Sequence, residues 1–96
     1  MKSIKEIRSE LREVRSFNSF WAMFGSKDVL PEQARELVDK YEDALATAPA
    51  KLQVYYQLYY CKALKQEAIS KSWGFSLSYM KMLSLELCEY LQTKIA

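Results

Sequence analysis

Apolar positions recur every three to four residues along most of the chain, which is the spacing of an amphipathic α-helix. The first such stretch runs from about Ser3 to Phe24, with Lys, Glu and Arg filling the opposite side. Its apolar positions are Ile4, Ile7, Leu11, Val14 and Trp21. Ser3 can cap this helix and Gly25 can end it, so the pattern predicts one long N-terminal helix.

Two further helices are expected in the middle of the chain. The second begins at Pro31, whose fixed φ suits the first helical position, and stops before Pro49. The segment after Pro49 predicts a third helix, although its tyrosines and Val54 would also suit a strand. Its apolar positions are Leu52, Tyr55, Tyr56 and Tyr59. Their helical spacing favours core packing over stacking on the bases of single-stranded nucleic acid.

Residues 66–83 read QEAISKSWGFSLSYMKML, a hinge of small residues between two apolar helical patterns. Residues 66–73 predict a short helix, and Gly74 supplies a turn because glycine takes left-handed backbone angles without steric cost. Ser76 can cap a second, longer helix. The residues expected to lock these two helices together are Ile69, Trp73, Met80 and Leu83.

These patterns predict an all-α protein, a small domain of four to five helices that contains a helix-turn-helix. The chain has 96 residues, which is enough for one compact core and too few for two. Half of the residues are apolar and only two are glycine and two proline, as is typical of helices with short connections. Within one domain, 1–96, we expect residues 1–48 to form a helical pair used in oligomerisation and residues 50–96 to hold the helix-turn-helix.

Candidate catalytic and metal-binding groups are sparse. The chain has no histidine, and Cys61 and Cys88 lie far apart with no CxxC partner, which excludes the usual zinc and iron-sulfur spacings. No glycine-rich phosphate loop and no nucleophile with a visible base occur. We therefore expect no enzyme, no metal and no cofactor. Separated thiols without a signal peptide or a long apolar run suit a protein of the reducing cytoplasm, away from the membrane.

The net charge of +2 is unevenly spread along the chain. Residues 1–48 carry nine acidic side chains against eight basic ones, whereas residues 49–85 carry one acid, Glu67, and five lysines. These lysines are Lys51, Lys62, Lys65, Lys71 and Lys81. The positive excess surrounds the hinge at Gly74, where a phosphate-binding surface would need it, although a solvated basic face would look the same.

Residues 58–91 combine a leucine and aromatic entry, a Glu-Ala-Ile-Ser run, a Gly-Phe-Ser turn and a long final helix. The residues that carry these features are Leu58, Tyr59, Tyr60, Leu64, Glu67, Ala68, Ile69, Ser70, Gly74, Phe75, Ser76, Met80, Leu83, Leu87 and Leu91. The pattern resembles the helix-turn-helix of region 4 in bacterial sigma factors. It is also similar to the sigma-like modules of small phage regulators in Gram-positive bacteria, the ArpU and RinA type of late-transcription activator.

The resemblance implies a transcription regulator, of phage or prophage origin, that binds double-stranded DNA and has RNA polymerase as a further candidate partner. The residues it assigns to DNA binding are Lys62, Lys65, Lys71, Ser76, Leu77, Ser78, Lys81 and Met82. The final helix departs from the family pattern because its outward positions offer a single lysine, where sigma-like recognition helices present several basic residues to guanine edges and phosphates. These positions are Leu77, Ser78, Lys81, Met82 and Leu85. The final helix is also apolar nearly all round, which is typical of a helix buried on most sides.

A second hypothesis follows from that departure. The chain would be a non-enzymatic helical interaction or scaffold protein that keeps the helix-turn-helix shape and packs Leu77, Met82 and Leu85 on a partner chain. Fold resemblance alone does not decide between the two functions. The salt dependence of binding distinguishes the two functions, because phosphate contacts weaken steeply as salt rises and an apolar interface barely responds.

The aromatic side chains of the first helix predict self-association. A domain of this size has little interior with which to cover Phe17, Phe20, Trp21 and Phe24 together. The stripe from Ile4 to Trp21 is close to a heptad repeat, so it could pair with its own copy or with the last helix of the neighbouring chain. We therefore expect a homodimer or a higher oligomer.

Overall fold

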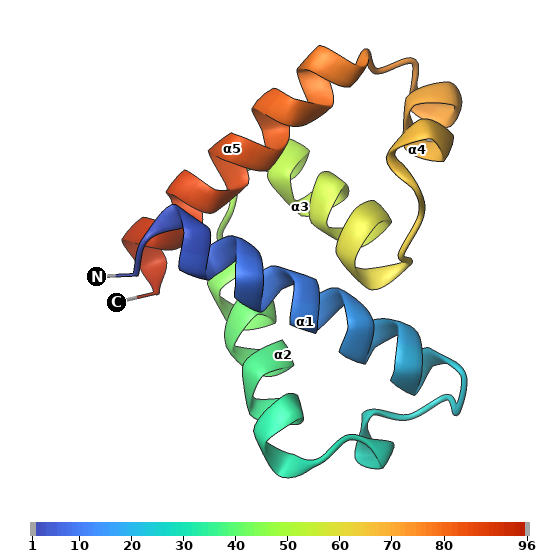
Figure 1. Cartoon of the computed structure of the whole chain (residues 1–96), viewed down its shortest axis with the longest axis vertical. Coiled ribbons are helices and arrows are strands. Elements are labelled where there is room, and N and C mark those ends of the chain that lie inside the picture. Colours follow the sequence, from blue (N-terminus) through green and yellow to red (C-terminus); the bar gives the residue numbers. More distant parts are fainter. Residues whose placement is uncertain (1, 96) are drawn as a thin grey trace.

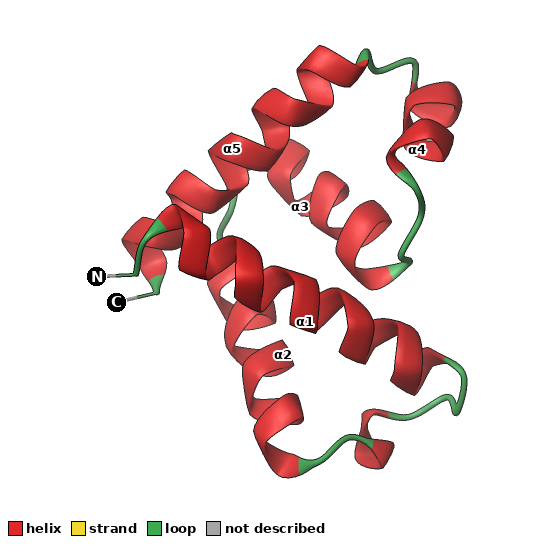
Figure 2. Cartoon of the chain, viewed as in Figure 1, coloured by secondary structure: helices red, strands yellow, loops and turns green. Residues whose placement is uncertain are grey.

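The computed structural model describes residues 2–95, which form five α-helices and no strand (Figure 1, Figure 2). The α-helices are α1 (Ile4–Ala22), α2 (Glu32–Leu45), α3 (Ala50–Tyr56), α4 (Gln66–Trp73) and α5 (Leu77–Lys94). Two shorter elements are the 3₁₀-helix η1 (Lys27–Val29) and the π-helix η2 (Gln57–Cys61). The predicted all-α class is confirmed.

The ends of α1 follow from the residues that cap it. The Ser3 hydroxyl accepts a hydrogen bond from the backbone N–H of Glu6 at 3.2 Å, which satisfies a free amide of the first turn. The helix ends at Ala22, slightly before the predicted Phe24. Gly25 follows with a φ of +77°, and its N–H donates to the carbonyl of Trp21 at 3.0 Å. A left-handed residue at this point turns the chain away from the helix axis.

The apolar stripe of α1 lies at the centre of the core. Ile7, Leu11 and Val14 are completely buried, because α1 contacts α2, α5 and η2. The prediction that this stripe pairs with a second copy of the chain is therefore wrong, since the chain's own helices cover it. Phe17 and Trp21 are half-buried against the same core. The completely buried residues that α5 contributes are Met80, Leu83, Leu87, Cys88 and Leu91.

The third helix is present after Pro49, but it ends as a π-helix. α3 runs directly into η2, where the N–H of Lys62 donates to the carbonyl of Gln57, five residues back, at 2.9 Å. Ala63 then takes a positive φ of 53°. The buried tyrosines of this segment are Tyr55, Tyr56 and Tyr60. They belong to the core, so they offer no stacking platform for bases.

Side chains of α1 satisfy the carbonyls at the end of η2. The Arg15 Nε donates to the Tyr59 carbonyl and its Nη2 to the Ala63 carbonyl, both at 3.0 Å. The Asn18 Nδ2 donates to the Tyr60 carbonyl, also at 3.0 Å. The last carbonyls of a helix lack partners within it, so α1 supplies them here. These bonds hold α1 beside the point where the chain enters α4.

Figure 1 places α1 between α2 and the α4–α5 pair, with both ends of the chain on one side of the molecule. The Gln92 Nε2 donates to the Lys2 carbonyl at 3.1 Å, which ties the end of α5 to the start of α1. The buried residues form a single hydrophobic cluster drawn from both halves of the chain. The N-terminal part of α1 therefore crosses the C-terminal part of α5, and the part around Arg15 and Asn18 lies beside η2 (Figure 1).

Candidate nucleic-acid interface

A three-residue turn joins α4 to α5. Gly74 has a φ of +68°, and the Ser70 hydroxyl donates to the Phe75 carbonyl across the turn. The Ser76 hydroxyl accepts from the backbone N–H of Tyr79 at 3.1 Å and so caps α5. The positive φ and the cap agree with the predictions made from the sequence at Gly74 and Ser76.

Three of the four residues expected between α4 and α5 lie in that contact. Ile69, Met80 and Leu83 are completely buried. The prediction for Trp73 is wrong, because its side chain is 50% exposed and its ring lies 6.3 Å from that of Phe75 between centroids. Trp73 is the last residue of α4, and its ring lies beside Phe75 of the following turn.

The structure places all of the residues assigned to DNA binding on the surface. These residues are Lys62, Lys65, Lys71, Ser76, Leu77, Ser78, Lys81 and Met82. They do not form one cluster. Lys65 and Leu77 line one surface hollow and Lys81 lines another, whereas the other five line neither. The Ser76 hydroxyl oxygen is engaged as the cap of α5, where it accepts from the Tyr79 N–H, and its own O–H can still donate to a ligand.

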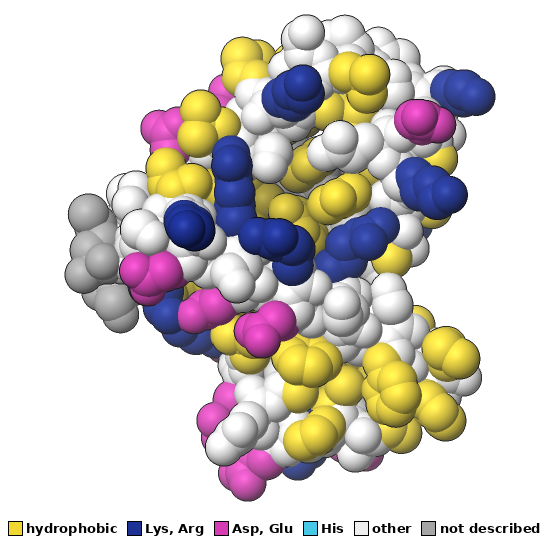
Figure 3. Space-filling model, in the orientation of Figure 1, with side chains coloured by type: hydrophobic (Ala, Val, Ile, Leu, Met, Phe, Trp, Pro, Cys, Tyr) yellow, Lys and Arg dark blue, Asp and Glu magenta, His cyan; other side chains and the backbone are white. Residues whose placement is uncertain are grey.

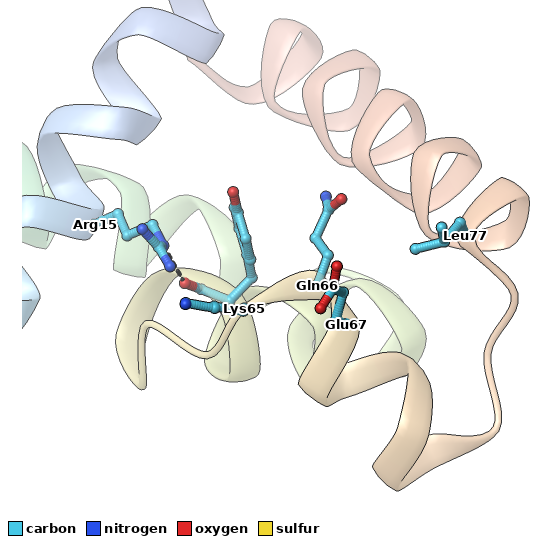
Figure 4. A pocket seen from close by; sticks show the side chains of 6 residues that line it. Arg15, Lys65, Gln66, Glu67 and Leu77 are labelled. Atoms are coloured by element: carbon cyan, nitrogen blue, oxygen red, sulfur yellow. Dashed lines mark hydrogen bonds between the residues drawn. The ribbon is translucent and has the colours of Figure 1, made fainter.

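The first hollow lies between α1, α4 and the start of α5 and has a volume of about 490 Å³. Figure 4 shows Arg15 entering it from α1, Lys65, Gln66 and Glu67 from the start of α4, and Leu77 from the first residue of α5. The Arg15 guanidinium also lies over the Tyr59 ring, 4.6 Å from its centroid. Its two bonds to carbonyls leave further N–H groups free to donate.

The second hollow, of about 400 Å³, is lined by Arg8, Gln66, Lys81 and Ser84. Because Gln66 lines both hollows, they adjoin, and together they form what we call the basic groove (Arg8, Arg15, Lys65, Gln66 and Lys81). Figure 3 shows Lys and Arg side chains gathered around this hollowed part of the surface. Glu67 is the acidic side chain that lines it.

Arg8 of α1 lines the second hollow together with Lys81 and Ser84 of α5. Burial raises the pKa of the Cys88 thiol, and a hydrogen bond and positive charge from Arg8 act in the opposite direction. Cys88 lies one turn beyond Ser84 on the same side of α5. Arg8 therefore lies beside α5 at the end of the basic groove.

Charge on α1 is sorted between its two sides, which was not predicted. Arg8, Arg12 and Arg15 follow one another at intervals of four and three residues, so they share one side of the helix. Glu6, Glu10 and Glu13 share another side. Glu10 accepts from the Tyr41 hydroxyl at 2.7 Å and pairs with Lys2 and Lys40, which directs the acidic side toward α2. Charge counting over residues 1–48 missed this because the acids cancel the arginines in the sum.

The cations of the protein divide into two groups. Those near α2 and α3 form ion pairs, namely Lys2, Lys27, Arg35, Lys40 and Lys51. Among residues 2–95, the cations that form no ion pair with a carboxylate are Lys5, Arg8, Arg12, Arg15, Lys62, Lys65, Lys71, Lys81 and Lys94. This second group includes every cation of the basic groove. The side chains of this second group carry positive charge that is available to an external anion.

Other kinds of site find no support in the described part of the chain. Across residues 2–95, no three His, Cys, Asp or Glu side chains lie together as metal ligands would. None of the helices described combines the length and the apolar character needed to cross a membrane. Comparisons with protein-family models, curated proteins and solved structures found no match to this chain. The choice of function therefore rests on the surface residues themselves.

Proposed function

We propose that this protein is a cytoplasmic transcription regulator that binds double-stranded DNA. In this proposal α4, the turn at Gly74 and α5 act as a sigma-region-4-like helix-turn-helix, with α5 as the recognition helix in the major groove. The observation that carries the proposal is the group of cations without carboxylate partners around the basic groove, beside that turn. These cations lie beside the recognition helix, where they can contact the phosphates along one side of the major groove.

The phosphate contacts come from two parts of the chain. Lys65 lies at the start of the α4–α5 unit, and Arg8, Arg12 and Arg15 extend the positive surface along α1. A duplex carries phosphates on both sides of its major groove, so a recognition helix needs positive charge beside it as well as on it. The arginines of α1 thus add to the positive charge of Lys81, the lysine in the first two turns of α5.

The test is binding to duplex DNA at two salt concentrations. Neutralising about five phosphates gives a slope of log K against log salt near −4, so affinity should fall by about two orders of magnitude between 50 and 200 mM salt. Fluorescence anisotropy with a labelled duplex of about 24 base pairs would measure this. If binding to duplexes of mixed sequence is undetectable even at 50 mM salt, or changes less than about threefold between the two salts, the proposal is wrong.

The alternative function also has an observation in its favour. Leu77, Met82 and Leu85 are 54%, 49% and 42% exposed, which is unusual for large apolar side chains on one short helical segment. In a helical interaction protein these side chains would pack on a partner chain. Binding that persists unchanged at high salt would favour this function over DNA binding.

A further inference from the structure

The exposed side of α5 near the turn has an unusual composition for a recognition helix. It presents Leu77, Met82 and Leu85, with Ser78 and Lys81 between them. A guanine edge calls for a forked donor such as arginine, and an adenine edge calls for asparagine or glutamine. This side of α5 carries none of these. Its apolar side chains suit a contact with methyl groups.

The charge around this surface favours an anionic partner. Residues 74–85 contain no Asp or Glu, and Lys81 lies within the apolar row. Glu86, the next residue, forms an ion pair with Lys51 at 2.8 Å between its Oε2 and the lysine Nζ, so its charge is partly compensated. Arg8 and Lys65 flank the row in the basic groove. An apolar row with cations beside it and no acid matches the major groove of DNA, whose edges carry phosphates and whose floor exposes the bases.

On the basis of the proposed function, we infer that α5 recognises A·T-rich duplex DNA through the C5-methyl groups of thymine. Thymine is the base that presents an apolar group in the major groove, where it contacts apolar side chains. Leu77, Met82 and Leu85 supply these contacts, and the Ser78 hydroxyl can bond to either kind of base pair. Residues 77–85 span about 12 Å at 1.5 Å per residue, so the contacts cover about four base pairs.

The decisive experiment removes the methyl group alone. Two hairpin duplexes of about 24 alternating base pairs, one of adenine with thymine and the other of adenine with uracil, differ only at C5 of the pyrimidine. Burial of one such carbon contributes about fourfold in affinity, so three contacts predict at least tenfold weaker binding to the uracil duplex. Equal affinities within twofold, with the steep salt dependence retained, would overturn this inference and leave DNA binding standing.

Variants of α5 test whether these side chains cause the difference in affinity between the two duplexes. In a Met82→Gln, Leu85→Gln double variant, which keeps the Leu77 contact, the ratio of the two affinities should fall to about fourfold. Glutamine favours helix and both positions are exposed, so α5 is expected to remain folded, which circular dichroism would verify. Leu64→Gln, at another exposed leucine outside α5, is the matched control and should keep the wild-type ratio. A ratio unchanged in the double variant contradicts the assignment. If the wild type binds neither of these duplexes but binds duplexes of mixed sequence, this inference alone is overturned. If it binds none of them, the proposed function is overturned.

Discussion

The side-chain amide of Asn18 donates a hydrogen bond to the Tyr60 carbonyl at 3.0 Å, across the buried contact between α1 and η2. The Asn18 Oδ1 accepts in turn from the Trp21 indole N–H at 2.9 Å. Asn18 is only 2% exposed, so water cannot replace either partner. A single buried side chain thus orients Trp21 and holds the π-helix against α1.

We predict that Asn18→Leu lowers the free energy of unfolding by about 2 kcal/mol, because two buried polar groups lose their partners. Asn18→Asp separates the two bonds, since a carboxylate can still accept from Trp21 but cannot donate to Tyr60. The free energy of unfolding of the Asn18→Asp variant should therefore also be lower than that of the wild type. Urea unfolding followed by circular dichroism measures both, with Ser19→Ala at an exposed neighbour as the control. A stability of Asn18→Leu equal to that of the wild type would show that the bond to Tyr60 contributes nothing.

The turn between α4 and α5 gives a second prediction. A Cβ atom added at Gly74 would meet nothing within 4 Å, so the cost of substitution comes from the backbone angle alone. We expect the free energy of unfolding to fall by about 1 kcal/mol for Gly74→Ala and by up to about 3 kcal/mol for Gly74→Val. Gly74→Asn should be the least affected of the three. Gly25, with a φ of +77° and the same open space, is a matched site where alanine should cost a similar amount. Equal melting temperatures for the valine and alanine variants at Gly74 would contradict this account.

Much of the fold could be predicted because it depends on local sequence. Apolar periodicity located the helices, Ser3 and Ser76 marked caps, and Gly74 marked a left-handed residue. These features act over a few residues, where spacing and side-chain type decide the outcome. The π-helix was not predicted, because its stability depends on bonds from Arg15 and Asn18, which lie more than 40 positions earlier in the chain.

The basic groove was predicted only in part for the same reason. Lys65 and Lys81 lie near the hinge in sequence, so local charge pointed to them. Arg8 and Arg15 reach the groove only because α1 packs against α5 and η2. Their spacing on one side of the helix was a visible signal, but spacing alone does not tell which element that side will face.

The cations around the groove give a third prediction. Alanine at Arg12, Lys62, Lys65 or Lys71 should each weaken DNA binding similarly for all sequences and flatten the salt slope by about one unit. Lys81→Ala should instead relax sequence preference, because Lys81 lies among the residues that face the bases. Lys40→Ala makes the same change in net charge at an ion pair on α2, away from the groove, and it should leave the slope near that of the wild type. A common effect of all these variants would mean that only net charge matters.

Alkaline pH gives a fourth prediction. Burial raises the pKa of Tyr56 and of Tyr60, and it raises the pKa of the Cys61 thiol to about 11. Each group holds its proton more tightly in the folded state. Its stabilising contribution is therefore complete below the unfolded pKa, about 8.5 for Cys and 10 for Tyr, and is lost as the pH rises toward the folded value. The urea midpoint should fall between pH 8 and pH 11.

Two tyrosine variants test which buried hydroxyl groups cause this loss of stability at alkaline pH. The buried Tyr56 hydroxyl has no hydrogen-bond partner among residues 2–95, so Tyr56→Phe should be at least as stable as the wild type at pH 7 and should lose less stability at pH 11. The Tyr41 hydroxyl donates to Glu10 at 2.7 Å, so Tyr41→Phe should be less stable at pH 7. A wild-type midpoint that stays constant up to pH 11 would contradict the role of the buried phenols.

The end of α1 carries an apolar patch, formed by Phe20, Met23, Phe24 and Val29. Met23 is 80% exposed, and the rings of Phe20 and Phe24 lie 5.1 Å apart between centroids. Figure 3 shows these apolar side chains gathered over the C-terminal end of α1 and the segment after it. The neighbouring ion pairs of Lys27 with Glu42 and Arg35 with Asp28 give the rim both signs of charge. Such a rim can face its own copy across a two-fold axis without net repulsion.

The last prediction is that the protein self-associates through this patch. Phe17 and Trp21 pack on the core instead, so substitutions there would also unfold the chain. Phe20→Ser with Phe24→Ser should convert a dimer into an 11.2 kDa monomer in sedimentation at tens of micromolar. Trp73→Ser, which removes an equally exposed ring elsewhere, should leave the mass unchanged. The serine pair should also weaken DNA binding, since a monomer holds one half-site. A wild-type chain that sediments as a monomer would show that the patch faces solvent or a different partner.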